Sequence, residues 1–265
     1  MKPLITEVPL NQRVTLSVTD DGEGPALLLV HGLACTSVDW LSQQAAFRKE
    51  YRVIAPDLRG HGSSSVVDGA YDATTYAADL IALLDQLSVE TCVVIGHSLG
   101  GLIASVMAVE HPHRVRGVVA LDPGYGPPNN VAMYQQLGSL AATPGGLAAV
   151  YEASDSSLTP PFFVDLHRRG LLTTDPRVVA NSWRDCFLAA DVPAFDENYL
   201  RRRACAVLAV HSKNHPGFAA WERTLWADAA DPAHVALELP VGHWPHHDAP
   251  DLINQLIADW LKALH

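Results

Sequence analysis

The chain has 265 residues, 48% of them hydrophobic and 18% charged, which is enough apolar material for one large domain with an insertion. Its formal net charge of −11 argues against binding to nucleic acid or to an anionic membrane surface, because both need a basic face. The sequence has no apolar run of about 18 residues and no signal-peptide pattern at its start, so we expect a cytoplasmic protein that does not bind membranes.

The first half of the chain, residues 26 to 123, alternates short β-rich runs with helical stretches. The expected strands cover residues 26–30, 51–55, 93–95 and 115–121, and an amphipathic helix is expected over 74–87. This alternation predicts an α/β fold with a parallel sheet and helices on both faces. The carboxyl ends of parallel strands meet at one edge of the sheet, where ligands bind in open sheets of this kind.

One motif in this half indicates a catalytic residue. Residues Gly96 to Gly100 read Gly-His-Ser-Leu-Gly and fit G-x-S-x-G, the nucleophile elbow. The motif alone is weak evidence, but a buried strand over 91–95 precedes it and a helix over 99–110 follows it, which is the context that the elbow requires. A serine held in a strained turn needs neighbours without side chains. The sequence therefore predicts Ser98 as a nucleophile.

The pattern changes after residue 123. No convincing strand occurs before about residue 203, and helix-like pieces are separated by Pro and Gly. Strands return over 206–210 and 235–239, and a final helix is expected over 250–264 with Asp248 as its N-cap. We therefore predict a core in two parts, 1–125 and 204–265, with a helical cap over 126–203.

Four motifs in this order resemble the α/β-hydrolase superfamily over nearly the whole length. They are His31-Gly32-Leu33, Asp57-Leu58-Arg59-Gly60-His61-Gly62, the elbow at Ser98, and Gly242-His243-Trp244. The resemblance implies an α/β-hydrolase fold, a mostly parallel twisted sheet flanked by helices, with a helical cap inserted before the last two strands.

The resemblance also implies a general base. A serine hydroxyl needs a neighbour that takes its proton. The chain has 13 histidines, and His243 stands in the loop after the last strand, where the family keeps its catalytic histidine.

The acid departs from the common pattern of the family. After the penultimate strand most members carry H-G-x-x-D, but this chain reads His211-Ser212-Lys213-Asn214-His215 and has no carboxylate there. We expect Asp122, at the end of the strand over 115–121, to complete the triad. The alternative is that Asp122 only begins a turn. A minority of the family, among them the zearalenone-type lactonases, places its acid after this strand, and the resemblance is therefore to a capped ester or lactone hydrolase.

Substrate contacts are expected from backbone and cap. The N–H groups of Leu33 and Leu99 should form the oxyanion hole. The aromatic residues expected to contact the substrate are Trp183, Phe162 and Phe163 of the cap and Tyr125 just before it.

A serine nucleophile indicates acyl transfer through an acyl-enzyme. We expect a small, moderately apolar carboxylic ester or lactone as substrate. The alternatives are a C–C bond hydrolase or hydroxynitrile-lyase-like enzyme with the same triad, and a hydrolase-derived receptor for a small molecule. Besides the substrate, a second copy of the chain in a homodimer is the partner that the sequence leaves open.

No cofactor or metal is expected. His243, His246 and His247 do not have the spacing of a known ligand pattern. The four cysteines are scattered without C-x-x-C and are expected to be reduced.

Overall fold

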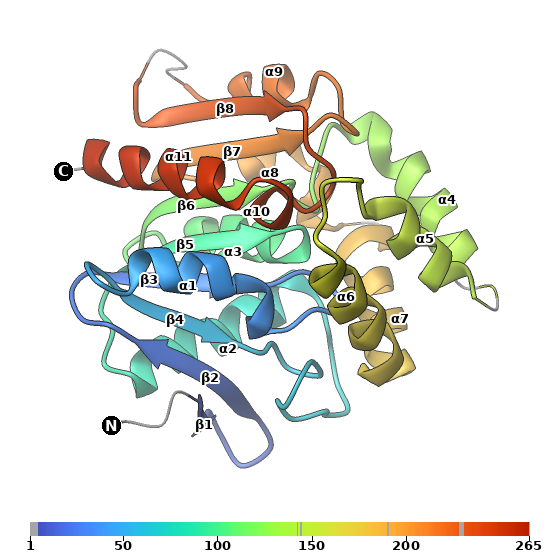
Figure 1. Ribbon diagram of the computed structural model, residues 1–265, viewed down its shortest axis with the longest axis horizontal. Helices are drawn as coiled ribbons and strands as arrows, with labels where there is room; N and C mark the ends of the chain where they lie inside the picture. Colours follow the sequence, from blue (N-terminus) through green and yellow to red (C-terminus); the bar gives the residue numbers. More distant parts are fainter. Residues whose placement is uncertain (1–4, 142, 144, 190, 228–230, 265) are drawn as a thin grey trace.

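The computed structural model describes residues 5–264 except 142, 144, 190 and 228–230. Within these residues, eight strands form one sheet in the order β1-β2-β4-β3-β5-β6-β7-β8 (Figure 1). The strands are β1 (Ile5–Pro9), β2 (Thr15–Asp21), β3 (Ala26–Val30), β4 (Arg52–Pro56), β5 (Cys92–His97), β6 (Val115–Leu121), β7 (Ala206–Ser212) and β8 (His234–Leu239). β2 pairs antiparallel with β1 and β4, and all other pairs are parallel. The predicted mostly parallel sheet is confirmed.

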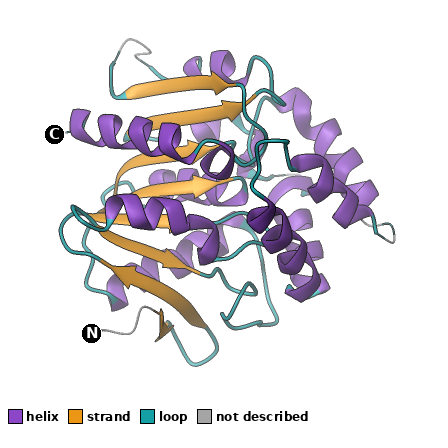
Figure 2. Ribbon diagram, in the orientation of Figure 1, coloured by secondary structure: helices purple, strands orange, loops and turns teal. Residues whose placement is uncertain are grey.

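Helices cover both faces of the sheet (Figure 2). One face carries α1 (Leu41–Phe47) and α11 (Pro250–Ala263), and the other carries α2 (Ala73–Gln86), α3 (Leu99–Glu110) and α9 (Phe218–Arg223). Along β3, Leu27 and Leu29 pack with the first set of helices, while Leu28 and Val30 pack with the second. Because side chains alternate along a strand, an uninterrupted apolar run such as β3 is buried on both sides.

The chain between β6 and β7 is helical. It contains α4 (Val131–Ala141), α5 (Gly146–Ser154), α6 (Pro161–Thr173), α7 (Pro176–Trp183) and the short α8 (Glu197–Leu200). Figure 1 shows α4 to α7 beside the carboxyl ends of the parallel strands. The insertion therefore precedes the last two strands, as predicted, and lies over the edge where ligands bind. The exact division at residues 125/126 and 203/204 stays a prediction.

The first two strands are absent from the sequence-based prediction. In β2, the small polar residues Ser17 and Thr19 are buried together with Leu16 and Val18. Polar residues on both sides of the apolar ones weaken the hydrophobic signal on which strand prediction depends.

The predicted N-cap of the last helix is wrong. Ala249 precedes α11 and makes no side-chain cap, whereas Asp248 ends the short helix α10 (Pro245–Asp248). The Asp248 carboxylate instead accepts hydrogen bonds from the Gly242 N–H at 2.6 Å, Thr159 Oγ1 at 2.6 Å and Ser156 Oγ at 2.8 Å. Asp248 therefore ties the loop after β8 to the cap. No helix of the described ranges is long and apolar enough to cross a bilayer.

Candidate active site

Ser98 lies in a strained turn between β5 and α3. Its φ of 51° and ψ of −117° place a non-glycine residue in a sparsely populated region. A Cβ on Gly96 would lie 2.1 Å from the Gly100 carbonyl oxygen, and a Cβ on Gly100 would lie 2.0 Å from the Val30 carbonyl oxygen. The two glycines of the motif are thus steric requirements, which is what the sequence pattern predicted.

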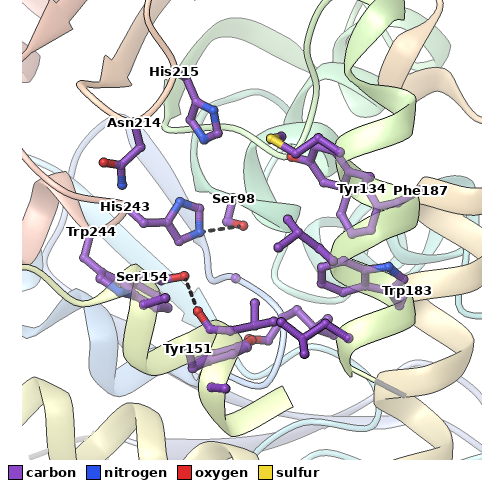
Figure 3. Close-up of a pocket in the computed structure, with 18 residues that line it drawn as sticks. Ser98, Tyr134, Tyr151, Ser154, Trp183, Phe187, Asn214, His215, His243 and Trp244 are labelled. Carbon is purple, nitrogen blue, oxygen red and sulfur yellow. Dashed lines mark hydrogen bonds between the residues drawn. The ribbon is translucent and has the colours of Figure 1, made fainter. Parts of the chain in front are cut away.

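His243 faces Ser98 from the loop after β8. Its Nε2 lies 3.2 Å from Ser98 Oγ (Figure 3). Its Nδ1 lies 2.7 Å from Asp122 Oδ2. With Nδ1–H donating to the carboxylate, Nε2 is free to accept the serine proton. His97 is positioned to hold this loop, since its Nε2–H donates to the His243 carbonyl oxygen at 2.7 Å.

Asp122 follows β6 and is fully buried. Its carboxylate accepts from the Ser212 N–H at 2.7 Å and from Ser212 Oγ at 3.1 Å, in addition to His243. Burial raises the pKa of the Asp122 carboxyl, but the hydrogen bond and charge of His243, with the Ser212 N–H, outweigh burial and lower that pKa below its usual value. The group is therefore a buried carboxylate whose charge is compensated by neighbours.

Two polar residues occupy the place where most of the family has its acid. His215 Nε2 lies 3.6 Å from Asp122 Oδ2, and the His215 ring stacks on Phe218 with centroids 4.8 Å apart. Burial lowers the pKa of His215 more than the charge of Asp122 raises it. Neither His215 nor Asn214 makes a hydrogen bond to the His243 ring among the described residues, whereas the Asp122 carboxylate accepts one from it.

The predicted oxyanion donors flank the serine. Among the described hydrogen bonds, none uses the N–H of Leu33 or of Leu99. His31 accepts the Leu58 N–H at Nε2 and donates from Nδ1 to the Gly32 carbonyl oxygen at 2.7 Å. Because this carbonyl and the Leu33 N–H belong to one peptide group, the hydrogen bond holds the Leu33 N–H in a defined direction.

A cavity of about 320 Å³ lies between the sheet edge and the cap. Ser98, His243, Asn214 and His215 lie on one side of it, and apolar cap side chains lie opposite (Figure 3). The cap residues that line it are Met133, Tyr134, Leu137, Leu140, Ala149, Val150, Tyr151, Ala153, Ser154, Trp183 and Phe187. Such an apolar wall with a few polar groups is typical of a small-molecule site.

Of the four aromatic residues predicted to contact substrate, the structure brings Trp183 to the cavity. It places the other three elsewhere, which corrects that expectation. Phe162 is 57% exposed at the start of α6. Phe163 is buried against His247, with ring centroids 3.7 Å apart. Tyr125 lies in the core, where its hydroxyl donates to Glu222 Oε1 at 3.2 Å and accepts from Arg203 at 3.0 Å.

The sequence reasoning missed the residues of α4 and α5. Tyr134 packs edge to face on Phe195 and against Phe187, while the Tyr151 hydroxyl donates to the Leu33 carbonyl oxygen. The signal was weak, because α4 has no fully buried residue and several of its apolar side chains line the cavity.

Two groups of side chains in the described residues could hold a metal ion: Asp122 with His215 and His243, and Asp39 with His246 and His247. In the first group Asp122 and His243 are already joined by a hydrogen bond, as described above.

Comparisons with known proteins agree with this architecture. A curated epoxide hydrolase from Caballeronia sordidicola is 40% identical over 111 residues, which are 41% of this chain and 34% of that protein. The magnesium-chelatase 30 kDa subunit from Rhodobacter capsulatus is 30% identical over 263 residues, which cover 92% of this chain and 89% of that protein. For the first curated relatives, the matched stretch spans only about a third of their length, 30% to 34%.

Solved structures share the whole fold. An esterase from Thermogutta terrifontis is similar with a TM-score of 0.80 and 26% identity, covering 98% of both chains. The enol-lactonase from Burkholderia xenovorans LB400 is similar with a TM-score of 0.79 and 22% identity, covering 95% of this chain and 98% of that one. The family model of the alpha/beta hydrolase fold matches residues 25–202. The chain therefore belongs to the alpha/beta hydrolase fold family.

Proposed function

We propose that this protein hydrolyses a carboxylic ester or lactone through an acyl-enzyme on Ser98. One observation carries the proposal: Ser98 Oγ lies 3.2 Å from His243 Nε2, and His243 Nδ1 lies 2.7 Å from Asp122 Oδ2. A nucleophile, a base and an orienting carboxylate in hydrogen-bond sequence are the parts that acyl transfer requires.

Each residue has a defined step in this reaction. Ser98 Oγ attacks the carbonyl carbon while His243 Nε2 takes the serine proton, and the N–H groups of Leu33 and Leu99 stabilise the oxyanion. His243 then gives the proton to the leaving oxygen, which releases the alcohol and leaves the acyl-enzyme. Water attacks next while His243 takes its proton, and His243 then returns a proton to Ser98 Oγ as the acyl–Oγ bond breaks and the acid leaves. Asp122 holds the Nδ1–H tautomer and stabilises the imidazolium.

The cavity supports a small, largely apolar substrate. Its volume of about 320 Å³ lies at the lower end of the range for ligand pockets, and its cap side is apolar. The esterase and the enol-lactonase among the structural neighbours act on the two substrate classes proposed here. An epoxide hydrolase is also among the relatives. Epoxide hydrolases of this fold attack with an aspartate, whereas residue 98 of this chain is a serine, and a serine favours acyl transfer.

The test compares two serine variants in the same cavity. Ser98→Ala should lower kcat by roughly 10⁴- to 10⁶-fold on p-nitrophenyl esters and lactones, because it removes the nucleophile. Ser154→Ala is the matched control, since Ser154 lines the cavity and hydrogen-bonds to the Val150 carbonyl oxygen. It should keep kcat within about threefold of wild type. Adding His243→Ala to Ser98→Ala should lower kcat little further, because the members of a triad act as a unit.

A fluorophosphonate probe and product analysis complete the experiment. The probe should add one phosphonyl group per chain at Ser98, detected by mass spectrometry. Retention of more than about a tenth of wild-type kcat by Ser98→Ala would refute the proposal. Cleavage of β-diketones but not of esters would favour a C–C hydrolase. Tight binding of a lactone with almost no turnover would favour a receptor.

A further inference from the structure

Three buried ionisable side chains meet behind the catalytic loop. His246 and His247 lie on α10, three and four residues after His243, and Asp39 lies in the helical turn Ser37–Trp40 ahead of α1. One potential ligand atom from each of the three lies within 4.8 Å of the other two. All three side chains are at most 1% exposed. The chain thus collects a carboxylate and two imidazoles in its interior, outside the cavity at Ser98.

Five of the six polar side-chain atoms of this cluster lack a partner in hydrogen-bond geometry. Among the described residues, no N–H or O–H group donates to either carboxylate oxygen of Asp39, to either ring nitrogen of His246, or to Nδ1 of His247, and the Cys35 thiol is the weak hydrogen-bond donor beside Asp39. A buried carboxylate without hydrogen bonds or a counter-charge is strongly destabilising. Buried charges in proteins are paired or coordinate metals. Five unpartnered atoms on three residues, with one potential ligand atom of each residue within 4.8 Å of the other two, therefore indicate room for a positive charge between them.

The ring orientations suit metal coordination. His247 Nε2–H donates to the backbone carbonyl oxygen of Asp39 at 2.9 Å, so that the lone pair is on Nδ1, the unpartnered nitrogen. Metal-binding histidines commonly donate their other ring N–H to a carbonyl or carboxylate in this way. Both rings are held by stacking: His246 on Trp40 with centroids 4.7 Å apart, and His247 on Phe163 at 3.7 Å. Little side-chain entropy is then lost when an ion binds.

We propose that Asp39, His246 and His247 bind one divalent transition-metal ion, with Zn²⁺ as the best-suited ion. Two imidazoles and a carboxylate are ligands that Zn²⁺, Co²⁺ and Ni²⁺ accept, whereas Mg²⁺ and Ca²⁺ prefer oxygen ligands throughout. The second oxygen of Asp39 can provide a fourth contact. Because the three side chains are closed to solvent, the ion has a structural role and does not touch substrate.

The site is connected to the catalytic loop. The His246 ring lies 4.6 Å from the His97 ring, and His97 Nε2–H donates to the His243 carbonyl oxygen at 2.7 Å. An ion on His246 and His247 would fix the start of α10, and with it the loop that carries His243. Metal binding should therefore stabilise the fold and reduce the mobility of that loop.

The experiment measures metal content and melting, and needs no substrate. The full chain is produced without a polyhistidine tag, stripped with EDTA, and given Zn²⁺ or Co²⁺ before gel filtration and elemental analysis. We expect one ion per chain and a rise in Tm of roughly 5–10 °C at a metal concentration of about 100 times Kd. Asp39→Asn and His247→Gln should each weaken binding at least about tenfold, measured by competition with a chromogenic chelator.

Two matched histidine variants separate this site from others. His113→Gln removes an exposed imidazole beyond α3, and His215→Gln removes one from the other three-residue group. Both should keep one ion per chain with unchanged affinity. Binding that survives Asp39→Asn and His247→Gln but is lost in His215→Gln would overturn the proposal.

A wild-type chain that holds less than about 0.1 ion and shows no change of Tm with Zn²⁺, Co²⁺ or Ni²⁺ would also overturn it. The wild-type measurements decide the question if a variant fails to fold. The result is independent of the esterase test, because neither Asp39 nor His247 takes part in acyl transfer.

Discussion

The carboxyl edge of the sheet and the cap above it are built by different means. At the sheet edge, Ser98, Asp122 and Ser212 stand at the ends of the adjacent strands β5, β6 and β7, and backbone pairing sets their spacing. The ends of β5 and β6 are fully buried. In the cap, by contrast, α4 has no fully buried residue, and its apolar side chains lie against the cavity.

This difference indicates which region determines the rate of the reaction and which determines the choice of substrate. Parallel pairing permits no slip without turning every side chain to the other face, so the sheet edge can hold reacting groups within fractions of an ångström. The cap helices contact the cavity mainly through apolar side chains, and apolar positions tolerate exchange when their volume is kept. Changes at the edge should therefore alter kcat, and changes in the cap should alter KM and substrate choice.

The largest effect is expected at the edge. Asp122→Asn should reduce kcat by about 10²- to 10⁴-fold with little change in KM, because the amide no longer holds the Nδ1–H tautomer of His243. Steady-state kinetics on the best ester of the panel measures this. His215→Ala serves as the comparison, since it removes the neighbour at 3.6 Å and not the hydrogen-bonded partner, and should cost less than about tenfold. Equal losses of kcat in both variants would show that Asp122 does not orient His243 by itself and that His215 contributes equally.

A second prediction concerns a buried ion pair where the chain passes from the cap back to the core. Arg203, just after α8, donates to Glu222 Oε1 of α9 at 2.7 Å, and both side chains are buried. Burial raises the pKa of the Glu222 carboxyl, but the charges and hydrogen bonds of Arg203 and His211 outweigh it and lower that pKa to about 2. Glu222→Gln leaves Arg203 as an uncompensated buried charge and should lower the free energy of unfolding by about 3–5 kcal/mol at pH 7.

The pH dependence of this pair has a defined sign. Because the folded-state pKa is below the ordinary value of 4.5, the stabilisation by Glu222 is complete above about pH 4.5 and is lost as the pH falls toward 2. Urea unfolding of wild type and Glu222→Gln between pH 7 and pH 3 should therefore show the two free energies converging at low pH. A constant difference over this range would contradict the assignment.

The smallest effect is expected in the cap. Trp183→Ala should raise KM by about three- to tenfold and change the ester-length profile, with kcat nearly unchanged, because the indole provides uniform binding. Phe162→Ala is the matched control, as Phe162 is an aromatic cap residue that is 57% exposed and outside the cavity. Its KM and profile should equal those of wild type. A large drop in Tm with an unchanged profile would instead make Trp183 a packing residue.

Much of the edge could be predicted from the sequence because it depends on local patterns. The apolar runs of β3 to β8 and the elbow glycines are signals within a few residues of one another. Asp122 could be placed beside Ser98 because residues that end neighbouring parallel strands meet. The catalytic roles of Ser98, His243 and Asp122 stay predictions until kinetics tests them.

The cap and the interior cluster were harder because they depend on tertiary contacts. Phe162 and Phe163 are adjacent in sequence, yet one is exposed and the other stacks on His247. Composition cannot separate them, since the stacking partner of Phe163 lies on α10, more than 80 residues further along the chain. Asp39 belongs to the group of His246 and His247 only after folding, because more than 200 residues separate them. Spacing alone therefore missed that group.

The position of Asp122 has a consequence for engineering the substrate range of this protein. With the carboxylate on β6, the loop after β7 carries no residue on which the proposed triad depends, yet Asn214 and His215 in that loop line the cavity. In laboratory evolution, randomising these two positions should retain a large fraction of active clones. The same loop in a relative that keeps its acid there would tolerate far less. This chain is accordingly a favourable parent for libraries that search for new substrates.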